Sequence, residues 1–291
     1  MAPPTPSSNA ASVGLVALAA TLWGGWGLVL RPAHLPPQAA VAVVFATLLI
    51  ATPWCLRRGL LADRGALWAL VLLGLADTGN AALYFAAIDR GPLAIAVLSH
   101  YLAPVLVALA APYISKQPLS RRTLVATPVS LLGLLLLVGG LAGPAPLVTA
   151  ALGGGSAFFY AVILFAAKRA SRAFRPLEIT TLHAWVSLAA LLLLFGKSAV
   201  PSVAAALPVA LGALVCGLGA SWLFYRGLER IEPPVAAVLA YLEPVSAAAL
   251  GWMAFGETLG AAQLMGGAAI VLAGVYVACE RRKNGARLAS E

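Results

Sequence analysis

The feature that most constrains this chain is a series of ten long apolar stretches. Each stretch has roughly 20 residues, the length that an α-helix needs to cross the ~30 Å hydrocarbon core of a bilayer. Short polar or Pro/Gly joints separate the stretches. They cover residues 13–30, 38–56, 66–88, 92–113, 122–141, 147–167, 176–196, 207–228, 234–254 and 260–280. The sequence therefore predicts an all-α integral membrane protein with ten transmembrane helices.

Composition excludes other classes of protein. Apolar residues make up 62% of the 291 residues and charged residues only 10%, whereas an average soluble domain has about 25% charged residues. A soluble enzyme of this size cannot hide so much apolar surface, and a transmembrane β-barrel would show alternating segments of ~10 residues. Cys55, Cys216 and Cys279 lack metal-ligand spacing and form no disulfide framework. We expect neither a metal nor a cofactor.

The net charge of +9 is explained by where the basic residues lie. With both termini on one side of the membrane, 16 of the 19 Lys and Arg residues share that side, and only Arg31, Arg90 and Lys197 lie on the other. The positive-inside rule makes the first side cytoplasmic. The sequence therefore predicts a multi-pass cell (inner) membrane protein with no nucleic-acid partner. Residues 1–12 are expected to form a disordered tail and residues 281–291 a basic cytoplasmic tail.

A shift of 140 residues aligns the chain with itself. Residues 101–105 (YLAPV) fall on residues 241–245 (YLEPV), and eight of the 26 positions from 83 to 108 are identical, against about three expected by chance. Each repeat, 13–141 and 147–280, holds five spans, and an odd number of spans inserts the second repeat upside down. Inverted repeats are typical of secondary transporters, which bind substrate near the midplane between the halves. A duplication that persists only because it packs well is the alternative.

The same shift pairs polar residues of one repeat with small apolar residues of the other. The pairs are Asp77 with Gly217, Asn80 with Ala220, His100 with Ala240, and Glu243 with Ala103. The scaffold is thus two-fold while its polar chemistry is not. A site for an asymmetric molecule would show this pattern.

Several short sequence motifs lie within or between the predicted spans. They are Trp23-Gly24, the prolines Pro104 and Pro244, and the segments 256–259 (GETL) and 263–267 (QLMGG). In these motifs the chain resembles, over residues 13–280, the drug/metabolite transporter superfamily in its ten-helix form of paired EamA domains. The first repeat departs from the pattern, because residues 115–119 (SKQPL) lack the acidic residue expected there. The resemblance implies an exporter, most similar to those that export amino acids, aromatic ones included.

Polar residues inside the spans mark a candidate substrate-binding site. A charged side chain at the bilayer centre costs at least ~2.5–3.5 kcal/mol, so it must face protein or water. Asp77, Asn80 and Tyr84 share one face of the third span at positions i, i+3 and i+7. This stripe indicates a cavity wall that binds a polar substrate through its ammonium group. The alternative is an interhelical network that only fixes packing, at ~0.6 kcal/mol per bond.

Pro104 and Pro244 interrupt the fourth and ninth spans. Each proline removes the hydrogen bond to the carbonyl four residues earlier, which belongs to His100 and Ala240 respectively. These prolines are candidate hinges that line the pathway, and a static kink stabilised by neighbours is an equal alternative. Three further candidate site residues lie directly before the kinks: Tyr101, Tyr241 and Glu243.

Aromatic side chains inside the spans complete the candidate substrate site. They are Trp23, Trp26, Tyr160, Trp185, Tyr225 and Tyr241. Tyr and Trp usually collect at membrane interfaces, and interior ones need a partner for their N–H or O–H, which a hydrated cavity supplies. Their rings also suit aromatic side chains or organic cations. His183 can equally be structural or functional, and no second ligand at i+3 or i+4 accompanies it.

The sequence predicts a secondary exporter of small metabolites rather than an enzyme. Aromatic and neutral amino acids are the leading substrates; drugs, organic cations or other metabolites are the alternative. No P-loop is present, so ATP is not expected to drive transport. Asp77, His100 or Glu243 could couple transport to protons, and passive exchange fits equally well. An intramembrane enzyme is disfavoured because zincin and nucleophile-elbow motifs are absent. The oligomeric state is left open.

Overall fold

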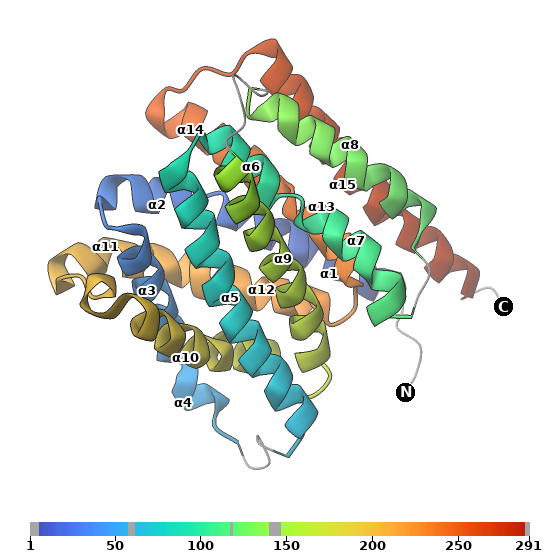
Figure 1. Cartoon of the computed structure of the whole chain (residues 1–291). Helices are drawn as coiled ribbons and strands as arrows, with labels where there is room; N and C mark the ends of the chain where they lie inside the picture. The colour runs from blue at the N-terminus through green and yellow to red at the C-terminus, as the bar shows by residue number, and fades with distance from the viewer. Residues whose placement is uncertain (1–5, 58–61, 117–118, 140–146, 289–291) are drawn as a thin grey trace.

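The computed structural model describes residues 6–57, 62–116, 119–139 and 147–288 (Figure 1). Throughout these residues every regular element is helical, which confirms the all-α prediction. The first half contains α1 (Pro6–Trp23), α2 (Trp26–Ala33), α3 (Pro37–Leu48), the 3₁₀ turn η1 (Leu49–Ala51), α4 (Thr52–Cys55), α5 (Arg64–Arg90), α6 (Leu93–His100), α7 (Ala103–Ile114) and α8 (Arg121–Leu137). The second half contains α9 (Leu147–Ala170), α10 (Pro176–Phe195), the 3₁₀ turn η2 (Gly196–Ala199), α11 (Val203–Ala213), the π-helical η3 (Leu214–Gly219), α12 (Ala220–Leu228), α13 (Pro233–Ala240), α14 (Leu242–Phe255) and α15 (Ala261–Leu288).

Consecutive short helices combine into membrane spans. Among the described residues, nine helical runs are long and apolar enough to cross a bilayer. The tenth predicted span is α8, whose 17 residues end at Leu137, just before the segment 140–146 that lies outside the described residues. With α8 included, the ten predicted helices are present.

The start of α1 corrects the prediction of a disordered tail over residues 1–12. The helix already begins at Pro6, because proline is well suited to the first helical position and tertiary packing holds the segment that follows. Ser12 and Val13 are buried, and a Cβ at Gly227 of α12 would lie 2.6 Å from the Ser12 carbonyl oxygen. Residues 1–5 lie outside the described residues. At the other end of the chain, α15 continues through Leu288.

Contacts between helices follow a pseudo-two-fold pattern. α5 packs along α9, and their counterparts in the other half, α12 and α1, pack along each other. α8 packs beside its own counterpart α15, and α7 beside α13 (Figure 1). Most of the large helix interfaces therefore join one half to the other. The two halves interlock, as two inverted repeats around a shared centre do.

Tyr101 and Tyr241 mark the axis of this pattern. They are counterparts in the 140-residue shift, and their rings stack with centroids 5.7 Å apart. The Tyr241 hydroxyl donates a hydrogen bond to the Tyr101 carbonyl oxygen at 2.8 Å. Residues related by a two-fold axis contact each other only beside that axis. The axis therefore passes between these two tyrosines, where the broken spans α6–α7 and α13–α14 meet.

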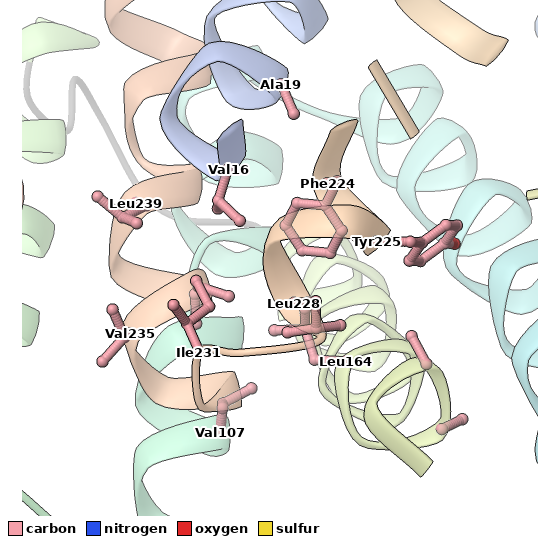
Figure 2. Close-up of a cluster of buried hydrophobic side chains, with 14 of the residues drawn as sticks. Val16, Ala19, Val107, Leu164, Phe224, Tyr225, Leu228, Ile231, Val235 and Leu239 are labelled. Carbon is pink, nitrogen blue, oxygen red and sulfur yellow. The ribbon is translucent and has the colours of Figure 1, made fainter. Parts of the chain in front are cut away.

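The largest apolar core lies toward the end of the bundle where α9 and α12 end and α13 begins. Side chains from α1 and α7 of the first half meet those of α9, α12 and α13 of the second half, with Phe224 and Leu228 in the middle (Figure 2). We call this region the packed end: Val16, Ala19, Val107, Leu164, Phe224, Leu228, Ile231, Val235 and Leu239. All of these side chains are buried, so at this end both halves form one water-free core.

Candidate functional site

The polar stripe of α5 faces the second half of the molecule. α5 is an uninterrupted helix, so Asp77, Asn80 and Tyr84 lie on one face as their spacing predicts. All three side chains are half-buried. Asp77 faces α10 and Asn80 faces α9. The stripe therefore lies at the interface between the halves, away from lipid.

Asp77 contacts His183, a residue whose role the sequence left open. Their Oδ2 and Nε2 atoms are 3.3 Å apart, and the His183 side chain is only 2% exposed. The other ring nitrogen, Nδ1, lies 2.6 Å from the Ile179 carbonyl oxygen. A carbonyl only accepts hydrogen bonds, so Nδ1 carries a proton. Nε2 and the carboxyl group then attract each other only when a second proton is held by one of them.

Ser156 of α9 joins Asn80 to His100. The Asn80 amide donates to the Ser156 carbonyl oxygen at 3.0 Å, and the Ser156 hydroxyl lies 2.8 Å from His100 Nδ1. α9 approaches α6 closely here, because a Cβ at Gly153 would lie 3.0 Å from the Ala96 carbonyl oxygen. Sequence reasoning missed Ser156, since a single serine after three glycines carries no signal of its partners. This network gives the buried His100 ring a hydrogen-bond partner at Nδ1.

Glu243 lies among tyrosines in the first turn of α14, just after the break that follows α13. Its half-buried carboxyl group hydrogen-bonds the Tyr101 hydroxyl. It also interacts electrostatically with the hydroxyls of Tyr84 and Tyr160. The ring of Tyr84 lies 4.4 Å from that of His100, centroid to centroid. Glu243 is thus a carboxyl group that interacts with tyrosine hydroxyls from both halves.

Tyr160 connects the two carboxyl groups. Its hydroxyl interacts electrostatically with both Glu243 and Asp77, and its ring meets the His100 ring edge-on at 5.6 Å. Tyr225 packs edge-on against His183 at 6.0 Å. We call this group the polar centre: Asp77, Asn80, Tyr84, His100, Tyr101, Tyr160, His183, Tyr225, Tyr241 and Glu243. Both halves contribute to the polar centre. The first half supplies the acid Asp77, and the second half supplies the acid Glu243.

The candidate tryptophans lie outside the polar centre, and their surroundings differ. Trp23 is half-buried, and its ring lies 5.0 Å from that of Phe224. The next residue, Gly24, fits against α14, because a Cβ there would lie 2.7 Å from the Glu243 carbonyl oxygen. Trp26 is also half-buried, at the start of α2. These positions place the break between α1 and α2 beside Glu243.

Trp185 does not join the polar centre. It is 51% exposed, and its indole N–H donates to the Thr52 hydroxyl at 3.2 Å. The reason is helical geometry: residues two apart on a helix point about 200° apart, so with His183 inward Trp185 points outward. Trp185 therefore lies apart from the other candidate site residues.

The candidate hinges lie at real breaks in the helices. α6 ends at His100 and α7 begins at Ala103, one residue before Pro104. α13 ends at Ala240 and α14 begins at Leu242, two residues before Pro244. The prolines thus start new helices rather than kink continuous ones, as their missing N–H groups favour. Each break carries a tyrosine of the axial pair.

A buried carboxylate ties the halves together near the packed end. Glu178 of α10 is 3% exposed and lies 2.6 Å from Arg57 Nε, just after α4. It also accepts a hydrogen bond from the Arg175 backbone N–H at 2.8 Å. The hydrogen bonds that Arg57 donates to Glu178 raise the pKa of the Arg57 guanidinium, which stays charged. The pairs Arg169–Asp63 and Lys168–Glu232 lie at the same end.

Comparisons with known proteins agree with this architecture. The sequence model of the EamA-like transporter family matches residues 11–139 and 148–279. An uncharacterized transporter of Archaeoglobus fulgidus is 34% identical over 242 residues, which cover 81% of this chain and 83% of that protein. A solved crystal structure aligns with a TM-score of 0.75 at 22% identity, covering 91% of this chain and 96% of that chain. The last similarity shows the fold alone.

Proposed function

Because this chain belongs to the EamA-like transporter family, we propose that it is a secondary exporter of small amine-bearing metabolites, above all aromatic and neutral amino acids. Substrate would bind at the polar centre and be exposed alternately to each side of the membrane as the two halves rock. The observation that carries this proposal is the pair of acids, Asp77 and Glu243, that the two halves bring to one group of tyrosines.

Carboxyl groups and aromatic rings together suit a protonated amine. A carboxylate binds an ammonium group by charge-assisted hydrogen bonds, and tyrosine faces attract a cation within ~6 Å. Glu243, Tyr84 and Tyr160 offer both kinds of contact at one place. The same rings can pack against an aromatic substrate side chain.

One feature favours organic cations as a second candidate class. The charged residues of the polar centre are both acids, and none of its ten members is Lys or Arg. An amino acid would therefore have to place its carboxylate on backbone N–H groups or hydroxyls. An amine without a carboxylate would avoid that requirement.

The packed end supports alternating access. It closes the bundle at the end where α5, α10 and α13 begin and where α9 and α12 end. Charged residues that the positive-inside rule puts in the cytoplasm contact one another there, among them Arg57 with Glu178 and Arg169 with Asp63. With both termini cytoplasmic, this structure would be the state closed toward the cytoplasm.

The contact between Asp77 and His183 supports proton coupling. The pair spans the interface of the halves, so a movement that separates α5 from α10 would break the contact between its two ionisable side chains. Other ionisable groups near the pair are the hydroxyls of Tyr160 and Tyr225. Asp77→Asn should remove the response of transport to a pH gradient, and it should also weaken substrate binding because Asp77 belongs to the polar centre.

Counterflow in proteoliposomes tests the proposed function. Vesicles loaded with phenylalanine, and separately with phenethylamine, are assayed for uptake of the same labelled compound, with and without a pH gradient. Phenylalanine counterflow that Glu243→Gln abolishes supports amino-acid export; activity with phenethylamine alone supports the organic-cation alternative. Equal uptake by wild type, Glu243→Gln and empty vesicles for both compounds would refute the proposed site.

A further inference from the structure

An apolar groove opens on the lipid-facing side of the bundle, away from the polar centre. It has a volume of about 770 Å³ and is lined by residues of α5, α7 and α9. α9 packs against both α5 and α7 and forms the floor of the groove, while α5 and α7 form its walls. Wall and floor residues such as Trp68, Leu109 and Phe158 are more than half exposed. In a membrane these side chains can only be covered by hydrocarbon or by another protein.

The groove has the length of one bilayer leaflet. Its floor runs from Phe158 to Arg169, 12 residues of α9, and the helical rise of 1.5 Å per residue makes this about 16 Å long. Half of the ~30 Å hydrocarbon core is about 15 Å. A single acyl chain from one leaflet would therefore fill the groove from end to end.

A basic group lies at one end of the groove. Among the described residues that line the groove, Arg169 is the only charged one, and its side chain is 42% exposed. The guanidinium lies over the start of α5, since a Cβ at Gly65 would be 2.8 Å from it. Arg64 is exposed in the same turn, and Asp63, at 3.7 Å from Arg169, neutralises only one of the two cations. Among the described residues the local charge is thus positive beside the N-terminus of α5, where the Asp63 carboxylate accepts a hydrogen bond from the Ala66 backbone N–H.

The surroundings of Arg169 are those of a membrane interface. Trp68, one turn into α5, is 72% exposed, and exposed tryptophans anchor proteins at the level of the lipid headgroups. The apolar groove then runs inward from that level.

We propose that this groove binds one anionic phospholipid, with its phosphate at Arg169 and the start of α5 and an acyl chain along α9. Basic pockets between spans on the cytoplasmic side are suited to such headgroups, and the charge pattern of the sequence places this end in the cytoplasmic leaflet. The site is separate from the polar centre, so it holds or fails independently of the proposed substrate.

Lipid-dependent stability of the full-length protein tests this inference. Purified protein in a neutral detergent is titrated with dioleoyl phosphatidylglycerol or dioleoyl phosphatidylcholine while its melting temperature is followed, because bound lipid raises stability by mass action. We expect phosphatidylglycerol to bind about fivefold more tightly, the effect of one basic group near an anionic headgroup. Equal binding of the two lipids by the wild type would overturn the proposal.

Two variants and one control locate the site. Arg169→Gln should remove the preference for phosphatidylglycerol, whereas Arg172→Gln, one turn away and outside the groove lining, should keep it. Ala110→Phe, which narrows the groove, should weaken binding of the acyl chain and so of both lipids. sn-Glycerol 1-phosphate alone should give no stabilisation. A preference that survives Arg169→Gln, or a lipid-independent dimer that covers Trp68, would refute the assignment.

Discussion

The two parts of the ninth span differ sharply in their surroundings. α13 has all eight of its residues buried, whereas α14, which continues the same span past the break, buries only Gly251 among its 14 residues. The first span shows a related contrast, with Val16 and Ala19 of α1 fully buried and no residue of α2 buried. One side of the polar centre is therefore sealed by close packing, and the other side is held much more loosely.

This contrast teaches where the energy of a conformational change lies. Parting the packed end would expose a core that both halves build, at roughly 25 cal/mol per Å² of apolar surface. The opposite end joins its halves through contacts such as the exposed pair Arg31–Glu257, which contributes little. Substrate binding at the polar centre would have to offset the cost at the packed end before the molecule could open there.

The largest expected effect comes from removing charge at the polar centre. Glu243→Gln should lower counterflow roughly 10- to 100-fold, because a hydrogen bond to a charged group contributes about 1.5–3 kcal/mol. Its melting temperature should stay close to that of the wild type. Glu257→Gln, the same change at the exposed rim, is the matched control and should retain transport. Loss of transport in both variants, or in neither, would contradict the role of Glu243.

A substitution in the core of the packed end should make that end as loosely packed as the opposite end of the bundle. Leu228 is fully buried in the packed end, so Leu228→Ala should cost about 2–5 kcal/mol through lost burial and a cavity. The melting temperature should fall, and a cysteine placed at Ala19 should react faster with a membrane-impermeant thiol reagent added from the cytoplasmic side. Leu193→Ala, at a side chain that is 88% exposed, should change neither measurement.

The Arg57–Glu178 pair should have a smaller effect on stability than the core. Glu178→Gln removes the charge that two guanidinium nitrogens and a backbone N–H contact, so we expect a melting temperature several degrees lower. Glu229→Gln breaks the exposed Arg226–Glu229 pair and serves as control, since exposed pairs contribute little. If both variants have the melting temperature of the wild type, the Arg57–Glu178 pair does not hold the halves together.

The smallest effect on transport is expected from Trp185→Phe, and it tests which residues belong to the polar centre. Trp185→Phe should leave counterflow unchanged, because the indole points away from the polar centre toward Thr52. Tyr160→Phe, at a hydroxyl that faces both acids, should alter the apparent substrate affinity. A transport defect in Trp185→Phe larger than that in Tyr160→Phe would move the site to the outer face of α10.

The sequence allowed prediction of features that depend on local periodicity. Span length and the stripe of Asp77, Asn80 and Tyr84 follow from the helical repeat, and the breaks follow from two prolines. Partners across the halves could not be predicted, since nothing near His183 or Ser156 indicates which helix faces them. The direction of Trp185 was predictable in principle, had the inward side of α10 been fixed by His183. The helical start of α1 depends on packing against α12, which no local pattern reveals.

The tyrosine pair on the pseudo-two-fold axis has a consequence for energy coupling. Here Tyr241 donates to the Tyr101 carbonyl, while the Tyr101 hydroxyl contacts Glu243. When inverted repeats reverse their orientation, counterparts exchange surroundings, so Tyr101 would donate to the Tyr241 carbonyl and leave Glu243. The carboxyl group at 243 would then bind a cation with different strength on each side of the membrane. Such differential affinity is what any carrier requires to convert one gradient into another.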